Sequence, residues 1–99
     1  MTRFKVSDFP ALRNAFSGYL HEDFVKEYGS AAAAVLAFEA EADDDEVDRF
    51  RAEVHRFLEM AAKRDLTRVR AMLSKLGCRW DPPSREALAA ALNGSDTAA

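Results

Sequence analysis

Apolar residues recur every three or four positions along most of the chain, which is the spacing of one helix face. The clearest example is a third predicted helix that begins at residues 43–46 and runs to about Lys63 or Arg64. Its apolar stripe consists of Val47, Phe50, Val54, Phe57, Leu58 and Ala61. No stretch alternates apolar and polar residues for long enough to predict a strand. The pattern therefore predicts an all-α protein, a small bundle of four to five short helices.

Short polar residues and prolines mark where the predicted helices begin. Ser7 or Asp8 would cap the first helix, with Pro10 in its first turn. Asp81 would cap the last helix, with Pro82 at its first position. The caps predicted between them are Ser30 before an alanine-rich helix at 31–42, Asp43 paired with Glu46 in a capping box, and Asp65 before the fourth helix.

Glycines are predicted to end two of these helices. Gly29 breaks the chain before the alanine-rich helix, and Gly77 follows the fourth helix. A glycine just past a helix end adopts the left-handed conformation, and the next residue packs back on the last turn. That residue is Cys78. The chain should form one domain over residues 1–94, ending at Asn93-Gly94, with a disordered tail at 95–99.

Length and composition set further limits. With 48% hydrophobic residues among 99, the chain can form one hydrophobic core but hardly two. No apolar run approaches the roughly 18 residues of a membrane span, and the first residues lack the apolar region of a signal peptide. The single cysteine, Cys78, excludes an internal disulfide. We therefore expect a cytoplasmic protein that does not contact the membrane.

The net charge of −3 conceals an uneven distribution. Residues 1–48 hold four Lys/Arg and eleven Asp/Glu, a balance of −7, whereas residues 49–85 hold ten and four, a balance of +6. Such a dipolar chain indicates a charged partner for one half, although solvated helix faces alone also produce this distribution.

Candidate catalytic and metal-binding residues are few. A Cys–His pair would have to combine Cys78 with His21 or His55, but Cys78 stands where a packing contact is expected. A zinc site needs about four closely spaced ligands, which one cysteine and two scattered histidines do not supply. We therefore expect no catalytic residue, no metal and no cofactor, and we do not expect an enzyme.

The stretch from Gly18 to Ser30 concentrates two tyrosines, a phenylalanine, a histidine and three acids. Gly18 weakens the helix here by about 1 kcal/mol relative to alanine. We expect the helix to end or bend, with the side chains of His21 and Asp23 satisfying backbone groups at the bend.

Two charged regions raise alternatives. The acids Asp43, Asp44, Asp45, Glu46 and Asp48 follow closely on Glu39 and Glu41. They form either a solvated helix start or a docking surface for a basic protein. Basic residues on the third and fourth helices, namely Arg49, Arg51, Arg56, Arg64, Arg68 and Arg70, lack the aromatic and glycine-rich signatures of nucleic-acid recognition. We therefore expect no nucleic-acid partner.

Two segments together carry a family resemblance. They are Tyr19-Leu20-His21-Glu22-Asp23-Phe24 with Glu27-Tyr28-Gly29-Ser30, and much later Leu76-Gly77-Cys78-Arg79-Trp80-Asp81-Pro82. With this spacing and length, residues 9–92 resemble the small bacterial immunity proteins of contact-dependent growth inhibition systems. The resemblance implies a cytoplasmic protein that binds the toxic C-terminal domain of a delivered effector and inhibits it without chemistry.

The resemblance also divides the candidate residues into two groups. The recognisable motif would support the fold through Tyr19, His21, Asp23, Tyr28, Gly77, Trp80 and Pro82. The aspartate run at 43–48 lies outside the shared pattern and would contact the toxin, which is a basic nuclease if the acids are its docking surface. The alternative is a general helical interaction or adaptor module of an unrelated pathway. A neighbouring gene for a large secreted protein with a variable C-terminus would separate the two.

Overall fold

The computed structural model describes residues 4–93, all of whose regular structure is helical. A short 3-10 turn, η1 (Val6–Asp8), precedes six α-helices. They are α1 (Pro10–Tyr19), α2 (Phe24–Tyr28), α3 (Ala31–Glu41), α4 (Asp44–Ala61), α5 (Leu66–Lys75) and α6 (Arg85–Leu92). The predicted all-α class is confirmed, and five of these helices have at least seven residues. The predicted limit of the domain at residue 94 and the tail at 95–99 lie outside the described residues.

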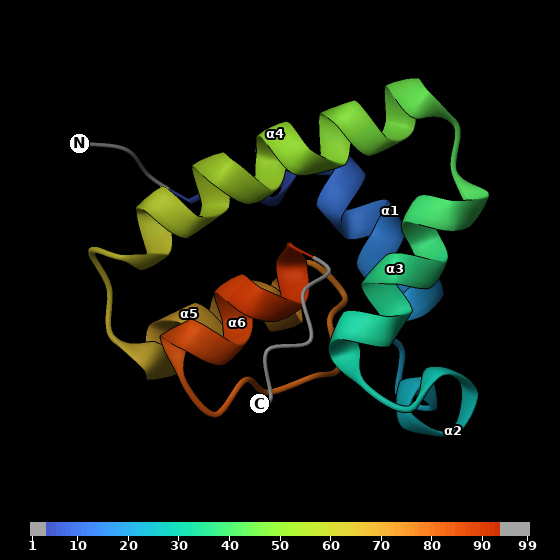
Figure 1. Cartoon of the computed structure of the whole chain (residues 1–99). Helices are drawn as coiled ribbons and strands as arrows, with labels where there is room; N and C mark the ends of the chain where they lie inside the picture. Colours follow the sequence, from blue (N-terminus) through green and yellow to red (C-terminus); the bar gives the residue numbers. More distant parts are fainter. Residues whose placement is uncertain (1–3, 94–99) are drawn as a thin grey trace.

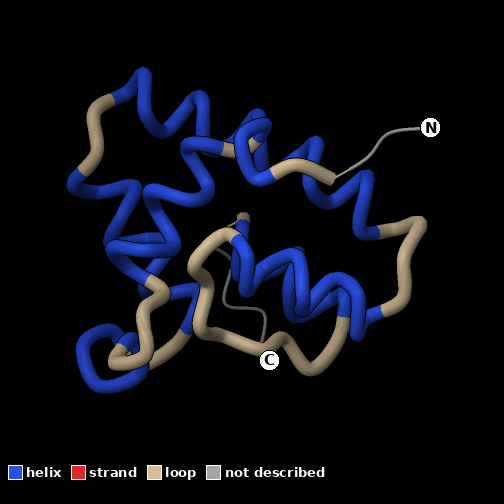
Figure 2. The backbone as a smooth tube through the Cα atoms, turned by 180° about the vertical axis from the view of Figure 1, so that it is seen from behind, coloured by secondary structure: helices blue, strands red, loops and turns tan. Residues whose placement is uncertain are grey.

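The longest helix, α4, forms one side of the molecule and the shorter helices lie beneath it (Figure 1). It packs on α1, and α1 in turn packs on α3. Helix α3 also contacts α2 and α6, and its many alanines allow these helices to approach closely. Seen from behind, loops connect helices throughout the described part of the chain (Figure 2).

One hydrophobic core joins all six helices. The predicted stripe of α4 supplies three fully buried or nearly buried side chains, Phe50, Val54 and Phe57. Large buried side chains from the other helices and their ends complete it: Phe9, Leu12, Phe16, Leu20, Phe24, Phe38, Val69, Leu73, Leu76, Leu88 and Leu92. Burying such a side chain contributes about 1.5–3 kcal/mol, so this core is the main stabilising term of the fold.

Most predicted helix ends are confirmed. The side chains of Ser30, Asp43 and Asp65 each accept a hydrogen bond from the backbone N–H three residues later, at 2.8–3.1 Å. Gly29 and Gly77 have φ of +91° and +88°. After Gly77, the N–H of Cys78 returns to the carbonyl of Leu73, and the Gly77 N–H donates to Ser74, which together form a Schellman motif.

Two predicted starts are wrong. Ser7 and Asp8 lie within η1 and cap nothing; Phe9 occupies the cap position of α1 without a side-chain bond. Pro10 does occupy the first turn. The helix takes its acceptor from elsewhere, because the Leu12 N–H donates to the buried carboxylate of Glu53 on α4, at 3.1 Å.

The last helix begins later than predicted, at Arg85, with Ser84 as its cap in place of Asp81. The Ser84 hydroxyl accepts from the Ala87 N–H at 3.1 Å. Pro82 cannot open the helix because Pro83 follows it, and a residue before proline is driven out of the helical region. Helix α4 likewise ends slightly early, at Ala61, followed by a turn.

Candidate functional site

The junction of α3 and α4 lies at one end of the molecule (Figure 1), and it carries a cluster of exposed acids. We call this cluster, Asp43, Asp44, Asp45, Glu46 and Asp48, the acidic corner. All five side chains are exposed. Asp43 caps α4, and the other four lie in its first two turns, where negative charge is favoured by the helix dipole. The bond to the Glu46 N–H thus fixes the carboxylate of Asp43, and the helix dipole stabilises the charge of the other four.

The two acids before the corner are tied to neighbours. Glu39 is half-buried and binds the guanidinium of Arg51 at 2.9 Å. The carboxylate of Glu41 accepts a hydrogen bond from the hydroxyl of Tyr19. The acidic corner is therefore connected, through Glu41, to the bend that follows α1.

Tyr19 is the centre of a small aromatic cluster at that bend. Its ring stacks on Tyr28 with centroids 5.7 Å apart and meets the edge of Phe38 at 5.6 Å. The hydrogen bond to Glu41, followed by partial burial, raises the pKa of Tyr19 to about 12. Partial burial also raises the pKa of Tyr28. Both tyrosines are therefore neutral at physiological pH and join α1, α2 and α3 through ring contacts.

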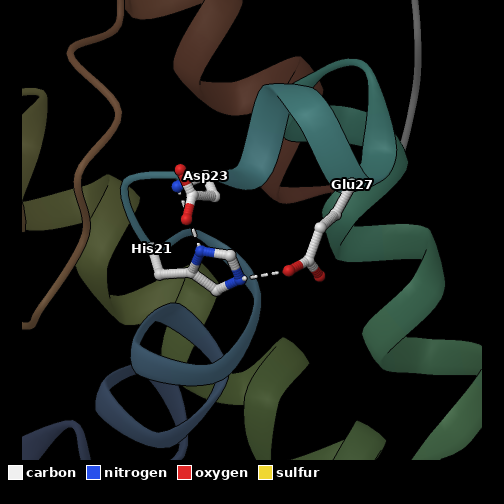
Figure 3. A network of polar contacts seen from close by, with 3 residues as sticks. All are labelled: His21, Asp23 and Glu27. Carbon is white, nitrogen blue, oxygen red and sulfur yellow. Dashed lines mark hydrogen bonds and ion pairs between the residues drawn. The ribbon is translucent and has the colours of Figure 1, made fainter.

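His21 holds the turn between α1 and α2 (Figure 3). Its Nδ1 accepts the backbone N–H of Asp23 at 3.1 Å, and its Nε2 faces a carboxylate oxygen of Glu27 at 3.5 Å. The expectation that His21 satisfies a backbone group is confirmed. For Asp23 it is wrong: its side chain is exposed and makes no cap bond to α2, so only its backbone takes part. Asp23 stands at the cap position, but its backbone (φ −100°, ψ 14°) is not extended as it is at Asp43 and Asp65, so its carboxylate is not directed at the first N–H groups of α2.

The second motif segment meets the first. The backbone N–H of Arg79 donates to the carbonyl of Leu20 at 2.8 Å, and a Cβ on Gly77 would lie 2.7 Å from Oγ of Ser17. Gly77 therefore approaches α1 where a larger residue would crowd it. The two segments, separated by 45 residues of chain, form one junction at the end of α1.

Trp80 and Pro82 lie in the loop that follows this junction. Trp80 is half-buried against the core, and its carbonyl accepts the thiol of Cys78 at 3.5 Å. Pro82 is fully buried, and its carbonyl accepts two hydrogen bonds from the Arg70 guanidinium, at 3.1 and 2.9 Å. Arg70 therefore fixes the loop between α5 and α6.

Several charged residues make structural contacts that the sequence does not indicate. Arg56 donates to the Asp8 carbonyl at 3.1 Å and lies over the ring of Phe9, and Arg85 donates to the carbonyls of Ala61 and Arg64 at the end of α4. Glu53, which is not part of the apolar stripe of α4, is only 6% exposed. None of these positions carries a local motif, because each partner lies far away in the sequence.

Comparison with protein-family models shows the family of this chain. The family model described as CdiI immunity protein matches residues 8–91. The chain belongs to this family. CdiI immunity proteins neutralise the toxin domains of contact-dependent growth inhibition systems and are not catalytic. No curated protein and no solved structure matches the chain.

The geometry of this CdiI family member agrees with inhibition by binding. Burial raises the pKa of the Cys78 thiol to about 11, so it is protonated and a poor nucleophile at neutral pH. His55 is exposed and pairs with Glu59 at 2.9 Å. Within residues 4–93, no three metal-ligating side chains gather as a metal site would require, and no helix has the length and apolar character to cross a bilayer.

Proposed function

We propose that this CdiI protein neutralises a basic, nucleic-acid-degrading toxin domain in the cytoplasm, and that the acidic corner contacts it. The observation that carries the proposal is the exposure of five carboxylates within six residues, all on the first turns of α4. A domain that acts on nucleic acid presents a basic surface to its polyanionic substrate. Carboxylates held in a fixed cluster complement that surface.

In this mechanism the inhibitor occupies the surface that nucleic acid would use. Complementary charge steers the two proteins together and mainly raises the association rate, and salt screens it. The corner suits this role because Asp43 and the helix dipole hold it in a defined position. No proton transfer or bond cleavage is needed from the inhibitor.

The motif residues have a different role in the proposal. Tyr19 stacks on Tyr28, and His21 accepts the backbone N–H of Asp23. Gly77 approaches Ser17 of α1, Trp80 packs against the core and Pro82 is buried. These contacts support a scaffold role for the motif, which keeps α3 and the start of α4 in place. Toxin specificity would then depend on residues outside it.

The test exchanges charge at the corner and at a matched site. Asp44→Lys with Asp45→Lys reverses two acids of the corner and keeps the Asp43 cap. The control, Glu59→Lys with Glu86→Lys, reverses two exposed acids elsewhere and changes the net charge equally. The binding partner is a catalytically inactive toxin domain from the effector gene beside this one. Stopped-flow association is measured at low and at physiological ionic strength.

The corner variant should associate at least about tenfold more slowly than wild type at low salt, with a smaller difference at higher salt. The control should lose much less. Equal rates for the two variants would mean that only net charge matters, and a wild-type rate for the corner variant would make the corner a solvated helix start. A toxin domain that degrades no nucleic acid would refute the proposed nuclease.

A further inference from the structure

Helix α3 lacks a polar face. Among its eleven residues only Glu39 and Glu41 are polar, and both belong to the last turn. A helix that is apolar all round is normally buried on all sides. Here the inner face is buried through Ala34, Val35 and Phe38, but the opposite face is not.

The outward face is a continuous apolar stripe. Ala33, Leu36, Ala37 and Ala40 are spaced by three and four residues, so they share one side of α3. Leu36 is 49% exposed, Ala40 is exposed, and the other two are half-buried. The remaining large exposed hydrophobic of residues 4–93 is Val25, on α2, which packs against α3.

Acids border this stripe. By helical geometry Glu39 and Glu41 lie on its two sides, and the acidic corner continues from its C-terminal end. An apolar centre with a charged surround is the common anatomy of a protein interface. The stripe and the corner therefore form one continuous surface across α3 and the start of α4.

We infer that the outward face of α3, centred on Leu36, is the apolar centre of the toxin-binding surface. Its partner is a protein surface in which an apolar contact is bordered by lysines or arginines. The inference rests on the proposed function and adds the contact that holds the complex after charge has steered it. A second copy of this chain fits less well, because residues 24–41 hold one cation, Lys26, against three acids.

The test replaces Leu36 without changing charge. Leu36→Gln keeps the length of the side chain and a good helix former, and the control Ala71→Gln places glutamine at an exposed position of α5. Helix α5 lies apart from α3 in both overall views (Figures 1 and 2). Binding of the inactive toxin domain is measured by stopped flow for association and by competition for dissociation.

Leu36→Gln should weaken binding by about 10- to 100-fold through faster dissociation, equally at low and high salt. Ala71→Gln should bind as wild type, and both variants should melt at the wild-type temperature. A wild type that fails to bind refutes the proposed function together with this inference. A wild type that binds, with dissociation unchanged in Leu36→Gln, refutes the inference alone. Self-association of the wild type that Leu36→Gln abolishes would assign the face to a second copy and also overturn it.

Discussion

The hydroxyl of Tyr19 joins the bend after α1 to the acidic end of α3. It donates to Glu41, while its ring stacks on Tyr28. The phenol must keep its proton for this bond. Ionisation would place a phenolate against a carboxylate, so the junction is sensitive to high pH and to the removal of Glu41.

Titration of Tyr19 tests this bond. Its pKa of about 12 exceeds the ordinary value of 10, so the folded protein holds the proton more tightly than the unfolded chain. The stabilisation is complete below pH 10 and is lost as pH rises from 10 toward 12. In a Tyr28→Phe background, which leaves one tyrosine, phenolate absorbance should report this pKa. Glu41→Gln should lower it toward 10, and an unchanged midpoint would show that the bond is absent in solution.

The three described glycines differ in what an added Cβ would cost. Gly77→Ala and Gly29→Ala each place alanine at positive φ, which costs about 1–2 kcal/mol of unfolding free energy. Gly77→Ala should cost more, because the new Cβ also crowds Ser17 Oγ, whereas Gly29 has open space. Gly18→Ala, inside α1 and unobstructed, should stabilise by about 0.5–1 kcal/mol. Urea unfolding measures all three, and equal losses at 77 and 29 would contradict the crowding.

At this scale, the predictable residues are those whose partners are near in sequence. Ser30, Asp43 and Asp65 bond to an N–H three residues away, and Gly77 acts on the turn just before it. Glu53 could not be predicted, because its partner Leu12 is 41 residues away. Sequence periodicity places it beside the apolar stripe, and only the packing of α4 on α1 buries it.

Helix α6 shows how a local signal can mislead when two candidate caps lie close together. The sequence Asp81-Pro82-Pro83-Ser84 offers an aspartate and a serine, each followed by residues that could start a helix. The choice depends on Pro83, which prevents Pro82 from adopting helical geometry. It also depends on Arg70, whose guanidinium holds the Pro82 carbonyl within the loop.

Paired alanine substitutions should distinguish the two caps. Ser84→Ala removes the acceptor for the Ala87 N–H and should lower the free energy of unfolding by about 0.5–2 kcal/mol. Asp81→Ala removes an exposed side chain outside the helix and should change stability by less than about 0.5 kcal/mol. Chemical denaturation of both variants is the measurement, and the opposite order of effects would restore Asp81 as the cap.

The spacing of apolar residues also could not locate the boundary between α1 and α2. Leu20, Phe24 and Tyr28 are spaced four apart, as on one helix face, yet α1 and α2 are separate helices. The break follows from His21, whose ring takes the Asp23 N–H that a continuous helix would direct to the Tyr19 carbonyl. The chain turns there, and Leu20 and Phe24 still reach the same core.

For the molecule as a whole, the single shared core predicts cooperative unfolding. Far-UV circular dichroism should show a predominantly helical spectrum, and heating should give one transition with coincident midpoints in circular dichroism and Trp80 fluorescence. Trp80 is suited to this comparison because it is the only tryptophan and packs against the core. A spectrum dominated by β-structure, or two separate transitions, would contradict this architecture.

The sequence predicted the class of fold and the two motif segments, but not that they meet. Their contact, between Arg79 and Leu20, depends on how α5 and the following loop return to α1. The acidic corner could be recognised in the sequence because its five residues lie within six consecutive positions. The exposed apolar face of α3 could not be recognised, because an alanine-rich sequence does not distinguish buried from exposed positions before the neighbouring helices are known.

The bond between Glu53 and Leu12 has a consequence for the order in which the newly made chain folds. Ribosomes add about 5–20 residues per second, so Glu53 is added about 2–8 seconds after Leu12. Until then neither η1 nor a capping side chain offers a hydrogen-bond acceptor to the first N–H groups of α1. The first turn of α1 therefore gains this hydrogen-bond acceptor only when α4 docks. Folding of the N-terminal third of the protein thus depends on synthesis of the middle of the chain.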